Sequence, residues 1–437
     1  MSEAAEIHLW GRMIGAVSLD EGAPTAVFQY TPAFARSSIQ LAPLMMPLRP
    51  EPFAFPALSH ESFKGLPGLL ADSLPDRWGS ALIDTWLAGQ GRSPGSASSV
   101  ERLCYVGARA MGALEFRPTR GPQGSPVEEI QIQTLVSLAS EILSEREEFI
   151  ASLREGREEE ALLEILSVGM SAGGARAKAL IAWNPETEEI RSAQVPAPAG
   201  FEQWLLKFDG VSGNKDKESL EDPEGHGATE FAYFKMATAA GISMSECRLF
   251  EENGRRHFMT RRFDRPSANA KLHLQSLGAI AHYDFNRAGA CSYEQAMMVI
   301  RRLGLSMAEV EQQFRRMTFN IIARNQDDHV KNIAFLMDQG GRWSLAPAFD
   351  MTFAYNSRGD WTAQHQMTLN GKRDGFSLAD FEQCAEAVSM KRGRAAAIIE
   401  EVRDAVAEWP VYAGAAGVDP SDIARIARAH RQSLARR

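Results

Sequence analysis

The residues best suited to chemistry lie in the segment 325–332, with the sequence NQDDHVKN. Asp327 stands five residues before Asn332, and Asp350 lies eighteen residues beyond Asn332. This order of acid, amide and second acid is typical of phosphoryl-transfer loops, where the first acid takes a proton from the attacking hydroxyl and the other two groups hold Mg²⁺ on ATP. It predicts Asp327 as the catalytic base and Asn332 and Asp350 as metal ligands. For Asp350 alone, the alternative is a helix N-cap.

The other polar residues of this segment have supporting roles in that interpretation. Asp328 is adjacent to Asp327 but does not stand five residues before an amide, so we expect it to be auxiliary. His329 is expected to brace the loop by hydrogen bonding, because no second histidine lies nearby in the sequence to complete a metal site. Lys331 could steady the γ-phosphate. The alternative is an ordinary charged loop that ends the helix-like run 314–323.

A stretch of small residues further upstream, 171–175, predicts a cradle for phosphate groups. Where side chains lack Cβ bulk, backbone N–H groups can approach phosphate oxygens closely. The adjoining Arg176 and Lys178 add positive charge. The residues expected in this cradle are Gly173, Gly174, Ala175, Arg176, Ala177 and Lys178. An ordinary turn between a helix and a strand is the alternative, because glycine pairs are common in turns.

Two charged residues between these segments complete the expected set. Lys207 lies in the apolar, strand-like run 204–208, where a lysine is either exposed on the polar face or paired. Glu230, on the next expected helix, could hold that lysine toward ATP phosphates, as the lysine–glutamate pair of kinases does. A solvent-facing lysine is the alternative. The order of glycine stretch, lysine, glutamate, acid–amide loop and second acid is that of protein-kinase-like folds.

These residues require elements that hold them, and at 437 residues the chain is too long for one compact core. The sequence predicts an α+β, protein-kinase-like two-lobed fold. We expect a small N-terminal α+β subdomain at 1–125, a small lobe with the glycine stretch and the ATP lysine at 126–265, and a mostly helical lobe with the catalytic loop at 266–437. The first boundary falls in the Pro- and Gly-rich segment 118–126, which is typical of a linker.

Hydrophobic periodicity predicts the individual elements. In the N-terminal subdomain, strands are expected at 7–10, 14–17 and 26–30, a helical region at 66–87, a helix at 100–105 and a strand at 112–116. In the small lobe, helices are expected at 135–153, 158–166 and 228–240, and strands at 179–183, 204–208, 247–250 and 256–260. Beyond residue 292 the chain is expected to be mostly helical, apart from a hairpin at 332–345.

The composition limits the classes of function. The net charge of −9 and pI near 5.6 argue against autonomous nucleic-acid binding, which usually needs a basic domain. The four cysteines lie far apart, so they suggest neither a zinc motif nor a disulfide framework, and reduced cysteines suit a cytoplasmic location. We expect no signal peptide, because the first nine residues lack an apolar core. We expect no membrane span, because the sequence contains no run of about 18 apolar residues.

Together these motifs resemble the HipA family of bacterial toxin–antitoxin kinases over nearly the whole chain. The most specific similarity is the DxHxKN motif that begins at Asp327, followed eighteen residues after its asparagine by an acid. The other shared motifs are WGRMIG at 10–15, LPD at 74–76, VGARAMGA at 106–113, the stretch 171–178, Lys207 and RFDR at 262–265.

The resemblance implies a serine/threonine protein kinase toxin that uses ATP and Mg²⁺, with Asp327 as its base and Asn332 and Asp350 as its metal ligands. Ser171 matches the serine on which the family autophosphorylates. A phosphate there would expel the loop, because a dianionic group does not fit a pocket for ATP phosphates. The matching ATP-binding residues are 173–178, Lys207, Arg261, Arg262, Phe263, His329, Lys331, Asn332, Phe349 and Asp350, of which 261–263 run beside the adenine.

The resemblance also implies partners. Known substrates of the family are aminoacyl-tRNA synthetases, and its usual partner is a small Xre-type helix-turn-helix antitoxin, HipB, which binds operator DNA as a dimer. We therefore expect a protein substrate of this class and a HipB-like antitoxin, with any operator DNA reached through the antitoxin. Two other functions stay open: a small-molecule phosphotransferase with the same acid–amide spacing, and an inactive co-repressor in a DNA-bound complex.

Overall fold

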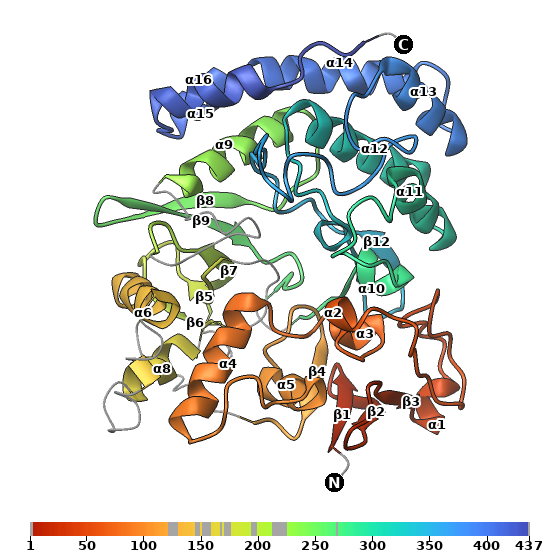
Figure 1. Ribbon diagram of the computed structural model, residues 1–437, viewed down its shortest axis with the longest axis vertical. Helices are drawn as coiled ribbons and strands as arrows, with labels where there is room; N and C mark the ends of the chain where they lie inside the picture. Colours follow the sequence, from red (N-terminus) through yellow and green to blue (C-terminus); the bar gives the residue numbers. More distant parts are fainter. Residues whose placement is uncertain are drawn as a thin grey trace. The chain divides into compact units, whose positions relative to one another are not determined.

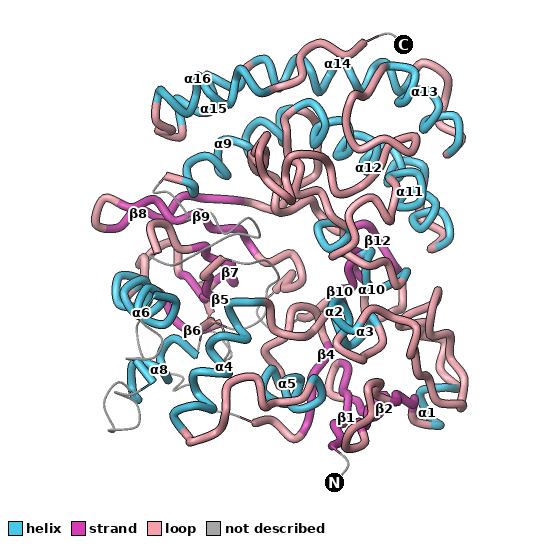
Figure 2. Tube along the Cα trace, in the orientation of Figure 1, coloured by secondary structure: helices cyan, strands magenta, loops and turns pink. Residues whose placement is uncertain are grey.

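The computed structural model describes residues 3–120, 130–144, 149–150, 159–166, 168–169, 176–193, 199–211, 225–267 and 270–435. The chain forms two compact units (Figures 1 and 2). The first comprises Met1–Glu224, Phe250–Gln275 and Met337–Arg342, and the second comprises Gly225–Leu249, Ser276–Leu336 and Trp343–Arg437. The division into three domains at residues 125 and 265 stays a prediction.

The first unit begins with an antiparallel sheet in the strand order β3-β2-β1-β4. Its strands are β1 (Glu3–Leu9), β2 (Arg12–Leu19), β3 (Val27–Tyr30) and β4 (Leu114–Arg117). Ala5 and Ile7 are buried and Glu6 between them is exposed, which is the period-two pattern that predicted a strand. The helices that follow β3 in this part of the chain are α1 (Pro32–Ala35), α2 (His60–Phe63), α3 (Gly68–Ala71), α4 (Arg77–Gly89) and α5 (Ser99–Val106).

The helical region predicted at 66–87 consists of two helices, because α3 ends at Ala71 and α4 begins at Arg77. Pro75 explains the break, since it has no N–H to donate and it disfavours helical backbone at the residue before it. Asp76 then starts α4 as its N-cap, with Oδ1 accepting the Gly79 N–H at 2.8 Å.

A second sheet of the first unit has the strand order β6-β5-β7-β9-β8. Its strands are β5 (Lys178–Trp183), β6 (Ile190–Ser192), β7 (Glu202–Lys207), β8 (Cys247–Glu252) and β9 (Arg255–Arg261), and β10 (His273–Ser276) follows in the chain. Helices α6 (Ile132–Ser144) and α8 (Glu159–Leu166) contact α4. The helix predicted for 135–153 is confirmed as far as Ser144, and residues 145–148 and 151–153 lie outside the described ranges.

A buried acid, Asp264, joins two of the motifs within the first unit. It accepts hydrogen bonds from Arg262 at 3.0 and 2.8 Å, from Arg265 at 2.7 Å and from the Gly112 N–H at 2.7 Å. Burial alone would raise the pKa of Asp264, but the two guanidinium charges hold it well below its usual range. Gly112 has φ +80°, and a Cβ there would meet the Leu274 nitrogen at 2.9 Å, so both backbone and space require glycine.

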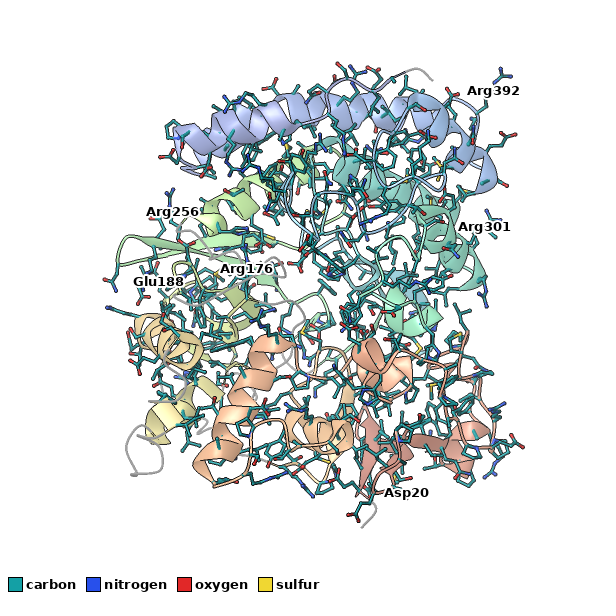
Figure 3. The ribbon with its side chains drawn as sticks, in the orientation of Figure 1. Asp20, Arg176, Glu188, Arg256, Arg301 and Arg392 are labelled. Atoms are coloured by element: carbon teal, nitrogen blue, oxygen red, sulfur yellow. The ribbon has the colours of Figure 1, made fainter. Side chains whose placement is uncertain are left out.

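The second unit is mainly helical, with α12 at its centre. Its helices are α9 (His226–Ala239), α10 (Leu277–Ala281), α11 (Tyr293–Arg302), α12 (Met307–Ile322), α13 (Leu378–Ala387), α14 (Arg394–Ala407), α15 (Trp409–Ala415) and α16 (Pro420–Ala429). A capping box formed by Ser306 and Glu309 begins α12, which packs against α11 and α14, while α9 packs against α14 and α15 (Figure 1). Charged side chains such as Arg301 and Arg392 lie on the exposed surface (Figure 3).

The region after the catalytic motif is less helical than expected. A short 3-10 turn, η1 (Val330–Asn332), precedes the hairpin of β11 (Ala334–Met337) and β12 (Trp343–Leu345), which confirms the predicted hairpin. Residues 346–377 then form neither helix nor regular strand, so the expectation of helix here is wrong. Isolated β-bridges, such as Asn325 with Ala354, hold this irregular segment in place.

Four histidines, of which His257 and His273 are buried and His282 and His430 are half-buried, predict how stability depends on pH. Burial lowers the pKa of His273 to about 3 and the pKa values of His257, His282 and His430 to about 4. As the pH falls below about 6.5, the unfolded chain binds protons that the folded chain does not, so stability decreases. We expect the urea midpoint to fall steadily between pH 7 and pH 5. A midpoint that is unchanged over this interval would contradict the lowered pKa values of these histidines.

Candidate active site

The predicted catalytic loop begins where α12 ends. Arg324 adopts a left-handed backbone with φ +60°, which is costly for a residue with a Cβ and turns the chain sharply. Its side chain offsets this cost, because Nε donates to the Ala429 carbonyl at 2.8 Å and Nη1 donates to Gln326 Oε1 at 2.9 Å. The Gln326 N–H donates to the Ala354 carbonyl at 2.9 Å. The loop is therefore held on one side by the C-terminal helix and on the other by the segment after Asp350.

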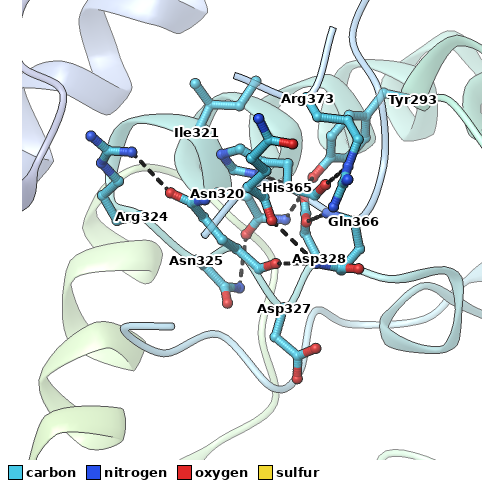
Figure 4. Close-up of polar contacts among 12 residues, drawn as sticks. Tyr293, Asn320, Ile321, Arg324, Asn325, Asp327, Asp328, His365, Gln366 and Arg373 are labelled. Atoms are coloured by element: carbon cyan, nitrogen blue, oxygen red, sulfur yellow. Dashed lines mark hydrogen bonds and ion pairs between the residues drawn. The ribbon is translucent and has the colours of Figure 1, made fainter. Parts of the chain in front are cut away.

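Asp327 is the accessible acid of this loop, with its side chain 40% exposed. The indole N–H of Trp361 donates to its Oδ1 at 2.5 Å, and His329 Nε2 lies 3.7 Å from the same oxygen. Figure 4 shows the Asp327 carboxylate pointing away from the buried cluster around Asp328. One carboxylate oxygen is thus oriented by the protein while the group stays open to a substrate, as a general base requires.

Asn332 is oriented by the same loop. It lies in η1, where its backbone N–H donates to the His329 carbonyl at 2.9 Å, and its side-chain Nδ2 donates to the Asp327 carbonyl at 2.9 Å. Because the carbonyl takes the amide nitrogen, Oδ1 is the Asn332 atom with the chemistry of a ligand for a hard cation such as Mg²⁺.

Asp350 is held by its backbone. It has φ +54°, a left-handed conformation that aspartate tolerates better than most residues and that is often found at functional sites. Asn325 Nδ2 donates to the Asp350 carbonyl at 3.4 Å and to Asn320 Oδ1 at 3.0 Å. Residues 346–377 form no helix, so none begins after Asp350 and the helix N-cap alternative is wrong.

The loop and the Asp350 segment meet at one pocket of the second unit. Its walls come from α12, from the catalytic loop and from both chain neighbours of Asp350. The lining residues are Gln313, Arg316, Asn320, Asn325, Asp328, His329, Asn332, Ile333, Ala348, Phe349 and Met351. Among the described residues no three His, Cys, Asp or Glu side chains cluster to hold a metal. A Mg²⁺ bound by Asn332 and Asp350 would therefore need phosphate oxygens and water as further ligands.

Asp328 is buried and structural, in agreement with its predicted auxiliary role. Its Oδ2 accepts from the Tyr293 hydroxyl and from His365 Nδ1 at 2.7 Å, and its Oδ1 accepts from the Gln366 N–H at 2.7 Å (Figure 4). Arg431 Nη1, which can only donate, lies 2.8 Å from His365 Nε2, so the histidine proton is on Nδ1. Burial would raise the pKa of Asp328, but His365 and the other donors hold it below its usual value.

Lys331 and His329 lie against aromatic rings. Lys331 Nζ is 4.5 Å from the centre of the Phe285 ring, a cation–π distance. The His329 ring lies between Phe285 and Trp361, with centroids 6.2 and 6.4 Å away. These are ring contacts, so the expected bracing of the loop by hydrogen bonds of His329 stays a prediction, as does the γ-phosphate role of Lys331.

The predicted phosphate-binding lysines lie side by side in the first unit. Lys178 of β5 and Lys207 of β7 are direct cross-strand partners. Lys178 is buried and forms an ion pair with Asp76 of the LPD motif at 2.9 Å, whereas Lys207 Nζ lies 5.7 Å from the centre of the Phe258 ring. The Asp76 pairing was not predicted, and it offsets the repulsion of two lysines placed opposite each other.

The other predicted site residues of the first unit have mixed outcomes. Arg261 pairs with Glu202 at 3.1 Å, and the side chain of Arg262 is committed to Asp264. The role of residues 261–263 beside adenine stays a prediction, in which their backbone groups would bind the base. Arg176 and Ala177 lead into β5 (Figure 3). Ser171, Gly173, Gly174 and Ala175 lie outside the described residues. Glu230 belongs to the second unit, where it is buried on α9, and its pairing with Lys207 stays a prediction.

Sequence reasoning missed Trp361, His365 and Gln366, which all contact the acids of the catalytic loop. They lie in a segment that was expected to be helical, more than thirty residues from Asp327. The only sequence signal for these contacts was that a polar segment of six residues contains an aromatic residue, a histidine and an amide. No spacing rule links such residues to a distant loop.

The comparisons with known proteins agree with this geometry. A family model described as HipA-like C-terminal domain matches residues 170–409, and one described as HipA N-terminal domain matches residues 5–117. The chain is similar to HipA in the solved complex of Shewanella oneidensis MR-1 HipA, HipB and operator DNA, with a TM-score of 0.63 and 18% identity over 99% of this chain and 96% of that chain. This confirms the predicted α+β, protein-kinase-like fold class.

A Helicobacter pylori proinflammatory kinase, CtkA, also matches, with 12% identity over 53% of this chain and 88% of that chain. Its TM-score of 0.34 is too low to indicate a shared fold. No curated protein matches the sequence. Among the described residues, no helix has both the length and the apolar character needed to span a bilayer.

The Asp328 cluster predicts a large stability loss on mutation. Asp328→Ala would leave the buried donors of Tyr293, His365 and Gln366 unsatisfied, which should lower the free energy of unfolding by about 3–5 kcal/mol. Asp422→Ala is the matched control, because it removes an exposed acid that pairs with Arg425 and should cost less than about 1 kcal/mol. Urea unfolding measures both, and equal losses would contradict a structural role for Asp328.

Proposed function

This chain belongs to the HipA family, and we propose that it is an ATP- and Mg²⁺-dependent protein kinase that phosphorylates serine or threonine. The observation that carries the proposal is the arrangement of the loop 325–332. Its exposed acid, Asp327, is oriented through one oxygen, and Asn332 lines a pocket together with both neighbours of Asp350. Acid, amide and second acid are the groups that phosphoryl transfer needs from a protein.

In the proposed reaction, the Asp327 carboxylate accepts the proton of the substrate hydroxyl as the hydroxyl oxygen bonds to the γ-phosphorus of ATP. The bond between that phosphorus and the β–γ bridging oxygen breaks, and ADP leaves with the electron pair. Asn332 and Asp350 would hold Mg²⁺, which neutralises charge on the phosphates. Lys207 and the glycine stretch 171–175 are the further groups proposed to bind the phosphates.

The proposal extends to regulation and partners. Autophosphorylation of Ser171 would remove the glycine stretch from the nucleotide site by adding a dianionic group. A HipB-like helix-turn-helix antitoxin is the proposed partner, because the similar Shewanella HipA was solved with HipB and operator DNA. An aminoacyl-tRNA synthetase in the cytoplasm is the proposed substrate class, on the ground of family membership alone.

Replacing the two acids tests the proposed chemistry. Asp327→Asn removes the base but preserves the side-chain shape, so the rate of label transfer from radiolabelled ATP to proteins of a cell lysate should fall at least about 100-fold. Asp350→Asn should cause a similar loss that is partly relieved at high Mg²⁺, because it removes a metal ligand. Asp404→Asn, which changes an exposed acid on α14, serves as the control and should leave the rate unchanged.

Transfer at the wild-type rate by either acid variant would overturn the assignment. Label that enters only small metabolites would identify a small-molecule phosphotransferase. Failure of the wild-type protein to bind MgATP in calorimetry would favour the inactive co-repressor.

A further inference from the structure

One segment of the irregular region, 361–366 with the sequence WTAQHQ, lies along the catalytic loop and contacts three consecutive residues of it. The Trp361 N–H donates to Asp327 Oδ1 at 2.5 Å. Gln326 Nε2 donates to the Thr362 carbonyl at 3.3 Å, and the Gln366 N–H donates to Asp328 Oδ1 at 2.7 Å. The loop and the segment therefore hold each other through both side chains and backbone.

The segment is itself rigidly fixed. The Gln366 side-chain amide donates to the carbonyls of Trp361 and, at 3.1 Å, of Gln364, which closes a tight turn below the indole. His365 is fully buried and bound to Asp328 (Figure 4). Its other ring nitrogen accepts from Arg431. Arg431 is in turn anchored by its backbone N–H, which donates to the Ile322 carbonyl at 2.8 Å. The position of Trp361 is thus set by buried groups, among them Asp328 of the loop, and not by its bond to Asp327 alone.

We propose that Trp361 is a positioning residue for the proposed catalytic base Asp327; the inference rests on the proposed kinase function. An indole has a single N–H donor and no acceptor, so it can only bind the carboxylate through an oxygen lone pair. Its bond to Oδ1 fixes the side-chain torsions of Asp327 and directs Oδ2 toward the incoming hydroxyl. An acid that is 40% exposed would otherwise rotate freely, and a displacement of about 1 Å at the reacting atoms can cost about 100-fold in rate.

Neighbouring groups restrict the indole as well. The His329 ring packs against it at 61° with centroids 6.4 Å apart. Asp327 stays substantially exposed beside the indole. The indole therefore binds one carboxylate oxygen without blocking access to the other. If the indole instead blocked the base, removing its N–H would speed the reaction, and this difference decides the test.

The test compares variants of the full-length chain. Trp361→Phe keeps an aromatic ring but deletes the donor. A second variant replaces Trp361 by the benzothiophene isostere, in which sulfur takes the place of the N–H and the ring shape is retained. Trp10→Phe is the matched control, because it deletes an indole N–H that donates to the Lys271 carbonyl at 2.7 Å in the first unit. The readouts are label transfer at saturating MgATP, the KM for ATP, MgATP affinity by calorimetry and the melting temperature.

Both Trp361 variants should transfer label at saturating MgATP roughly 10- to 100-fold more slowly than the wild type. Their KM for ATP, MgATP affinity and melting temperature should be unchanged. The Trp10 variant should transfer label at the wild-type rate. A wild-type or faster rate in either Trp361 variant overturns the inference, as does a slower rate that is matched by weaker MgATP binding. Failure of the proposed function is separate, because in that case the wild-type protein transfers no label and Asp327→Asn has no effect.

Discussion

Asp328 places a carboxylate where only 3% of the residue is exposed, and a buried charge is tolerated only when its oxygens are fully bonded. Tyr293, His365 and the Gln366 N–H satisfy it, and they come from two separate parts of the second unit, helix α11 and the segment 361–366. This requirement fixes the loop after α12. Asp327, one residue earlier, is then directed to solvent. The two adjacent acids thus lie in different environments, and in enzymes with paired carboxylates such a difference assigns the acids different roles.

A similar balance of buried charge organises the first unit. Asp264 joins the RFDR motif to Gly112 of the N-terminal motif, and Asp76 of the LPD motif joins α4 to Lys178 in the second sheet. Two pairs of family motifs, RFDR with 106–113 and LPD with Lys178, are therefore bound to each other within this unit. Their chemistry is that of structural ion pairs, which are strongly destabilising to break once buried.

Much of the fold and of the candidate site could be predicted from the sequence wherever the signal is local. Alternation located the strands, and the spacing of Asp327, Asn332 and Asp350 separated the exposed acid from its neighbour. The helical pattern at 66–87 predicted a helical region, and Pro75 is the local feature that divides this region into α3 and α4. The bonds of Trp361, His365 and Arg431 to the loop could not be predicted, because they join residues more than thirty positions apart and depend on tertiary packing in an irregular segment. Ser171 lies outside the described residues, so its role stays a prediction.

The central claim is that the loop 325–332 transfers phosphate to protein hydroxyl groups. Quantitative phosphoproteomics after brief expression tests it most directly, by comparing cells that express the wild-type chain with cells that express Asp327→Asn. The account predicts a small set of serine or threonine sites that gain phosphate only with the wild-type chain. Phosphoproteomes that are identical in the two cultures would contradict it.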